Sequence, residues 1–121
     1  MVALARGGTD GQKDWAAGAL GCLAINADNK VAIAKAGGIA PLVALARGGT
    51  DGQKEKAAGA LAILAHNDDN QVAIARAGGI APLVALARGG TDGQKVHAAG
   101  ALAILALNAD NKVAIAKAGW R

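Results

Sequence analysis

The sequence predicts an all-α solenoid built from three-helix units, and two observations carry that prediction. The first is a strict repeat, in which every motif recurs 41 residues further along: GGTDGQK begins at Gly7, Gly48 and Gly89, AAGAL at Ala16, Ala57 and Ala98, and DN-x-VAIA at Asp28, Asp69 and Asp110. The second is composition, because 53% of the residues are hydrophobic, mostly alanine, while Phe and Tyr are absent. Periods of this length are typical of arrays whose units bury their apolar faces against their neighbours. Small side chains favour close helix packing over a ligand cavity.

The first helix of each unit is expected to be short. In the middle copy, Asp69 is placed to cap a helix over residues 70–77, and Gly78 is placed to end it. Glycine is the usual residue just past a helix end. The pair Gly78-Gly79 then predicts a turn of the chain.

The second and third helices follow in order. The second is expected from Ile80 to Arg88, with Pro82 in its first turn, where a missing N–H costs nothing. Thr91 caps the third helix, and Gln94 three residues later completes a capping-box pattern. Thr9/Gln12 and Thr50/Gln53 repeat that pattern. The third helix is the longest, and is expected over residues 51–66 in its middle copy.

Short, medium and long helices in this order resemble an armadillo repeat, and the segment that carries the resemblance is AGGIAPLVALARGGTDGQKEKAAGALAILAHNDDNQVAIARAG. The resemblance covers the whole chain. It implies a single right-handed α-solenoid of nearly three repeats, divided at about 1–37 (partial), 38–78 and 79–121 (partial at its end). It also implies that the third helices line a concave groove, where members of the family often bind extended peptides. HEAT repeats are the nearest alternative, but they usually have two helices per unit.

The three copies differ most along one stripe of the third helix. Positions 15, 18, 22 and 25 fall on one side at 100° per residue, whereas Ala16, Ala19, Leu20 and Leu23 lie on the opposite, core side. By resemblance the stripe is the concave surface. Exposed apolar residues there favour a contact surface; ordinary packing between repeats and drift of surface residues are the alternatives. The candidate partner-binding residues are Trp15, Cys22, Ile25, Lys56, Ile63, His66, His97, Ile104 and Leu107.

The stripe departs from that of peptide-binding relatives, which often carry Trp and Asn on the third helix. The Trp position holds Gly18, Gly59 and Gly100, and the Asn position holds Cys22, Ile63 and Ile104. Capture of a peptide backbone by an amide ladder is therefore not expected. We interpret the glycines as room for close helix packing; copying of one unit, or room for a bulky side chain of a partner, are the alternatives. Trp15, Lys56 and His97 occupy equivalent positions on successive third helices and are expected to form a row of unlike side chains. Trp15 is expected either to stack on a cation or a partner side chain, or to cover apolar surface.

Charge and chemistry exclude several classes of function. The net charge is +4, but the basic residues recur singly near helix ends, as expected for cations that complement helix dipoles, without the aromatic-interleaved cluster of a nucleic-acid site. No apolar run approaches the roughly 20 residues of a membrane span. Cys22 is the only cysteine, so no internal disulfide is expected, as suits a cytoplasmic protein if the chain is natural, or a recombinant one.

Catalytic residues, metals and cofactors are likewise not expected. His66 and His97 lie at opposite ends of their helices, roughly 15 Å apart along the axis, too far apart for one metal ion. A Cys-His nucleophile pair would need an orienting group and an oxyanion site, and the sequence offers neither. The sequence therefore predicts that the protein is not an enzyme.

The first and last segments predict self-association. Met1 aligns with Leu42 inside a second helix, and the final Trp120-Arg121 replaces the Gly-Ile of the other copies, as at a junction. Arrays normally carry polar end caps, and none is visible. Head-to-tail contact into a ring or filament is therefore expected, with two-fold pairing of apolar faces as the other route. Near-identical uncapped copies also indicate an engineered array or a piece of a longer one. The first hypothesis is a non-catalytic scaffold that forms homo-oligomers; the alternative is a groove for an external peptide or helix.

Overall fold

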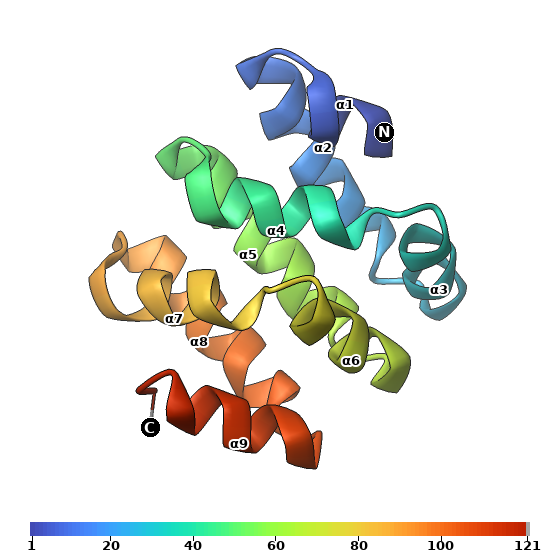
Figure 1. The fold of residues 1–121 in the computed structure, drawn as a ribbon. Coiled ribbons are helices and arrows are strands. Elements are labelled where there is room, and N and C mark those ends of the chain that lie inside the picture. The colour runs from blue at the N-terminus through green and yellow to red at the C-terminus, as the bar shows by residue number, and fades with distance from the viewer. Residues whose placement is uncertain (121) are drawn as a thin grey trace.

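The computed structural model describes residues 1–120, and over those residues the chain forms helices joined by short turns, with no strand (Figure 1). The helices are α1 (Val2–Gly7), α2 (Asp10–Leu23), α3 (Ala27–Lys35), α4 (Ile39–Gly48), α5 (Asp51–Leu64), α6 (Asp68–Arg76), α7 (Ile80–Gly89), α8 (Asp92–Leu105) and α9 (Ala109–Lys117). The predicted order of short, medium and long helices is confirmed from α3 onward.

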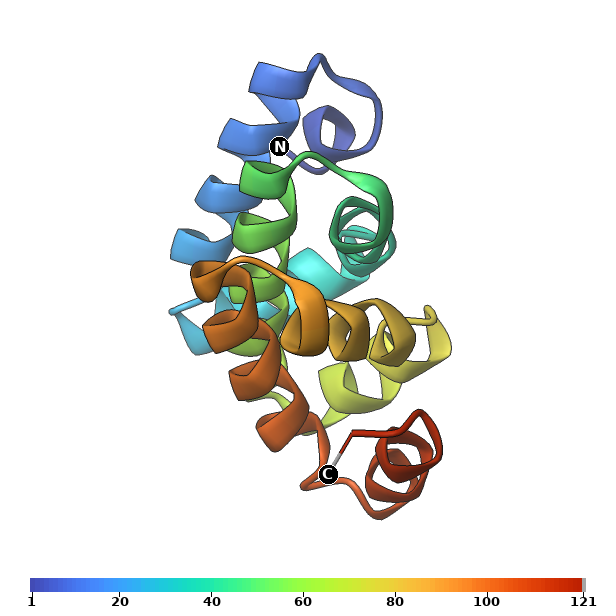
Figure 2. The same cartoon turned by 90° about the vertical axis from the view of Figure 1, so that its left-hand side faces the viewer.

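Equivalent helices stack into layers. The long helices α2, α5 and α8 pack side by side, as do α1, α4 and α7, and the short helices α3, α6 and α9 form a third row (Figures 1 and 2). The core lies between these layers, where Leu20, Leu61 and Leu102 are no more than 2% exposed. Leu23 was expected in this core and is 40% exposed, whereas its equivalents Leu64 and Leu105 are fully buried.

A glycine pair turns the chain sharply between the short and second helices. The axes of α3 and α4 meet at 83°, and those of α6 and α7 at 87°. Gly78 adopts φ +81°, a left-handed conformation that favours glycine. The N–H groups of Gly78 and Gly79 then donate to the carbonyls of Ala75 and Ile74, as in a glycine-terminated helix. The prediction that Gly78 ends the short helix is therefore confirmed.

The start of the short helix differs from the prediction. Helix α6 begins at Asp68, and its N-cap is Asn67, whose side-chain oxygen accepts from the N–H of Asn70. Asp69 is therefore not the cap. It lies within the first turn, where its carboxylate complements the positive end of the helix dipole.

The third helices begin at the predicted capping boxes. The Thr50 hydroxyl accepts from the N–H of Gln53 at 3.2 Å, and the Gln53 side-chain oxygen accepts from the N–H of Thr50 at 3.0 Å. The same pair of bonds is formed at Thr9/Gln12 and Thr91/Gln94. Helix α5 ends at Leu64, two residues before the predicted His66.

No single helix among residues 1–120 is long and apolar enough to cross a membrane, and only the bent pairs α3–α4 and α6–α7 reach the required length and hydropathy together.

Candidate functional site

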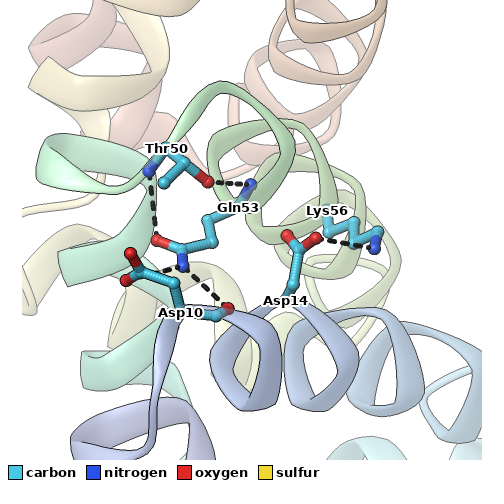
Figure 3. Close-up of polar contacts among 5 residues, drawn as sticks. All are labelled: Asp10, Asp14, Thr50, Gln53 and Lys56. Carbon is cyan, nitrogen blue, oxygen red and sulfur yellow. Dashed lines mark hydrogen bonds and ion pairs between the residues drawn. The ribbon is translucent and has the colours of Figure 1, made fainter.

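Buried glutamines fix the spacing of the third helices. The Gln53 Nε2 group donates to the backbone carbonyl of Asp10 at 3.0 Å, joining α5 to α2 (Figure 3). Gln94 makes the same bond to Asp51 at 2.9 Å, joining α8 to α5. Both glutamines are 2% exposed. Since a buried amide without a partner is costly, these bonds hold successive third helices in one register.

Two further contacts join successive repeats in the short-helix row. Asn70 donates to the carbonyl of Lys30 at 3.2 Å, and Asn111 donates to that of Gln71 at 2.9 Å. Arg47, at the end of α4, donates to the Gly78 carbonyl at 3.2 Å. Sequence reasoning missed these roles. The available signal was the recurrence of the same polar residue on otherwise apolar helices.

Six residues of the predicted stripe lie on the outer side of α2, α5 and α8, and the other three, Ile25, His66 and Leu107, lie in the turns that follow these helices. We call this surface the third-helix face and define it by Trp15, Cys22, Ile25, Lys56, Ile63, His66, His97, Ile104 and Leu107. Seven of these residues are exposed, and Ile63 and Ile104 are half-buried against the core. The largest apolar exposures are 59% for Trp15, 70% for Ile25 and 77% for Leu107.

Four residues of the third-helix face surround one shallow depression. Cys22, Ile25, Lys56 and Ile63 line a hollow of about 180 Å³ between α2 and α5. Its floor includes Gly18 and other small residues, so its wall is almost wholly apolar. Trp15, His66, His97, Ile104 and Leu107 do not line this hollow.

Lys56 and His97 each lean over the preceding helix. The aliphatic part of Lys56 covers Gly18, and its ammonium lies 3.3 Å from an Asp14 carboxylate oxygen (Figure 3). The His97 ring covers Gly59 in the same way. The second carboxylate oxygen of Asp14 is buried without a hydrogen-bond partner among the described residues. Lys56 and His97 therefore cover the glycines of α2 and α5, whereas no side chain covers the equivalent Gly100 of α8 within the described residues.

The glycines of the third helices are not required for close packing, contrary to our interpretation of the sequence. A Cβ added at Gly18 or Gly59 would meet its nearest neighbour at 3.6 or 3.5 Å, an ordinary contact, and one added at Gly100 would meet nothing within 4 Å. Gly100 therefore leaves a stretch of α8 backbone accessible from outside.

The histidines and acidic residues are the remaining candidate ligands and partners within residues 1–120. No group of three His, Cys, Asp or Glu side chains is placed to hold a metal ion there. His66 packs back on its own helix, with Nδ1 at 3.1 Å from the Ala62 carbonyl and 3.2 Å from that of Ile63. The ring therefore packs against the last carbonyls of α5, of which that of Ile63 also accepts from the His66 backbone N–H at 3.2 Å.

Comparison with known proteins agrees with this architecture. The family model for the Armadillo/beta-catenin-like repeat matches residues 26–66. A search of curated proteins finds no match. Among solved structures, two engineered proteins are each 33% identical with a TM-score of 0.92 over 98% of this chain, which corresponds to 49% and 29% of their own lengths.

A third solved structure adds a bound ligand. A designed armadillo repeat protein in complex with the peptide (KR)4 is 25% identical with a TM-score of 0.90, over 98% of this chain and 51% of that protein. The chain therefore spans about half or less of the length of these structures. The chain therefore has the fold of armadillo repeat proteins, and its residues 26–66 match the model of that family.

Proposed function

We propose that the third-helix face of this chain is the contact surface for an apolar segment of a protein partner. The observation that carries the proposal is the exposure of large apolar side chains on that face, with Trp15, Ile25 and Leu107 all more than half exposed. Large apolar side chains exposed together on one face favour an interaction site. As an armadillo repeat array, a non-enzymatic fold, the chain is a protein-binding scaffold.

The chemistry of the face favours an apolar segment over a strongly basic one. The designed relative binds (KR)4, whereas here the third-helix face itself carries the basic residue Lys56 and the imidazole of His97. The hollow between α2 and α5 has an almost wholly apolar wall that includes Cys22, Ile25 and Ile63. An amphipathic helix that inserts aliphatic side chains there would bury this surface without the amide ladder that the sequence lacks.

The proposal is tested with a dye-labelled amphipathic peptide of Leu, Ala and Lys, with (KR)4 as comparison. Fluorescence anisotropy is expected to show tighter binding of the amphipathic peptide. The double variant Ile25→Asp/Leu107→Asp should weaken that binding by about tenfold or more, because each charge would lie in the buried interface. Both positions are exposed, so the fold should persist.

The matched control is Val31→Asp/Val113→Asp, which adds the same two charges at exposed valines of α3 and α9, outside the third-helix face. It should leave the affinity unchanged. Equal weakening by the control and the double variant, or tighter binding of (KR)4, would count against the proposed contact surface.

A second candidate function is assembly of the chain with itself, and a specific feature favours it. Gln53 and Gln94 each donate to the helix behind them, at Asp10 and Asp51. The equivalent residues Gln12 on α2 and Asp92 on α8 are both exposed, and neither makes this bond within residues 1–120. A second copy that stacks against α2 or α8 along the direction of the array would repeat the contact that already joins successive repeats.

A further inference from the structure

Two equivalent clefts lie away from the third-helix face, at the corners where second helices turn into third helices. One has a volume of about 630 Å³ and lies between the α4–α5 corner and the α7–α8 corner; its lining includes Arg47, Asp51, Lys54, Pro82, Leu86 and Gly90. The other has a volume of about 440 Å³ and is lined by the matching residues of the preceding repeats, Arg6, Asp10, Lys13, Pro41, Leu45 and Gly49. The chain thus presents the same cleft twice, one repeat apart.

Each cleft combines an apolar floor with a cationic wall. In the larger one, Pro82 and Leu86 are buried side chains of α7 that form the floor. Arg47 is held in place because it donates to the Gly78 carbonyl, and its remaining N–H groups are available to a ligand. Lys54 is half-buried on α5, so its aliphatic stem lines the cleft below the ammonium group.

The single carboxylate in each cleft does not cancel the two cations. Asp51 lies in the first turn of α5, where the helix N-terminus offsets its charge, and its Oδ1 lies 3.5 Å from Nε2 of Gln94. Asp10 is placed in the same way, 3.4 Å from Gln53. Each cleft therefore keeps an excess of positive charge, in a chain of net charge +4.

The spacing of the clefts selects the ligand. Packed helices lie about 8–10 Å apart, so equivalent points on successive repeats recur at roughly that distance. An extended polyproline-type segment rises about 3.1 Å per residue, so every third side chain recurs at about 9 Å on one edge. We propose that the two clefts bind an extended protein segment with an acidic residue at every third position, flanked by aliphatic residues that pack on the Pro and Leu floor.

The probe is a fluorescein-labelled peptide of five Glu-Leu-Pro triplets, measured by anisotropy at low and moderate salt. The control peptide has the same composition with all glutamates at one end. The intact chain should bind the triplet peptide more tightly than the control peptide, and salt should weaken that binding. Lys13→Gln/Lys54→Gln should weaken it by about three- to tenfold.

The matched control variant is Lys35→Gln/Lys117→Gln, which removes the same charge outside the clefts and should retain the affinity. Equal weakening by both variants would reveal diffuse charge attraction and overturn the proposal, as would equal binding of the two peptides. Tighter binding of a twelve-residue oligo-dT would assign the clefts to nucleic acid instead. The Ile25→Asp/Leu107→Asp variant should keep the affinity for the triplet peptide; its loss would place this peptide on the third-helix face.

Discussion

At the scale of single residues, Gln53 links local folding to assembly of the array. Its side-chain oxygen closes the capping box on Thr50, and its nitrogen donates to the Asp10 carbonyl of the previous long helix. Gln12 closes the same box on Thr9 but is exposed, and its nitrogen has no hydrogen-bond partner within the described part of the chain. A comparison of Gln12, which makes only the capping bond, with Gln53, which makes both bonds, therefore distinguishes the contribution of the bond between repeats.

We expect Gln53→Ala to lower the free energy of unfolding by about 1–2 kcal/mol more than Gln12→Ala. Both changes remove the capping box, but only Gln53→Ala also leaves the Asp10 carbonyl without its buried donor. Urea denaturation followed by circular dichroism measures both variants. Equal losses would show that the bond between repeats contributes nothing to stability.

The sequence predicted that Gln53 closes a capping box, but it did not predict the bond that Gln53 makes to the previous repeat. The Thr-x-x-Gln spacing is a local pattern, and it identified all three capping boxes. The bond from Gln53 to Asp10 spans 43 residues, and no local pattern contains it. The polar ties made by Asn70 and Arg47 were missed for the same reason, because they depend on how neighbouring repeats face one another.

At the scale of the helices, glycine is expected to lower stability inside a helix and to raise it at a turn. Gly100 lies inside α8, where an added Cβ would meet nothing within 4 Å. Gly78 follows α6 at φ +81°, a conformation that alanine adopts only with strain. The two positions carry the same residue for different reasons.

Gly100→Ala is expected to raise the free energy of unfolding by about 0.5–1 kcal/mol, since glycine in a helix interior is unfavourable relative to alanine. Gly78→Ala should lower it by about 1 kcal/mol. Thermal denaturation of the two variants and the parent chain measures whether each substitution raises or lowers the stability of the protein. A destabilised Gly100→Ala variant would mean that α8 needs this glycine.

Helix order and the side of each helix were predictable, whereas some ends and burials were not. Periodicity placed Trp15, Ile25 and Leu107 on the exposed side of the long helices, and all three are exposed, although Ile25 and Leu107 lie in the turns after α2 and α8. It chose Asp69 as a cap where Asn67 serves, because both residue types cap helices and they lie two positions apart. That the exposed residues bind a partner stays a prediction, as do the repeat boundaries near residues 38 and 79.

At the scale of the whole molecule, each repeat is stabilised by its neighbours. Leu64 and Leu105 are fully buried, but the equivalent Leu23 is 40% exposed, since no repeat packs before α2 within the described residues. In an array of this kind, stability is the sum of repeat and interface terms. Covering Leu23 with a second copy would therefore add one more interface of the type already present twice.

The two routes to self-association give opposite results in matched variants. Light scattering after size-exclusion chromatography, over a range of concentrations, measures solution mass against the 11.8 kDa chain. If copies stack end to end, mass should grow with concentration. Leu23→Glu should then hold the protein near the monomer mass, because a charge would enter the stacking surface, while Ile25→Glu should leave the growth of mass with concentration unchanged.

If copies pair through the third-helix face, the solution mass should be a discrete multiple of the chain mass. Ile25→Glu should then abolish this oligomer, while Leu23→Glu should leave it intact. A parent chain that stays monomeric at high concentration would rule out both routes and leave an external partner as the occupant of the third-helix face.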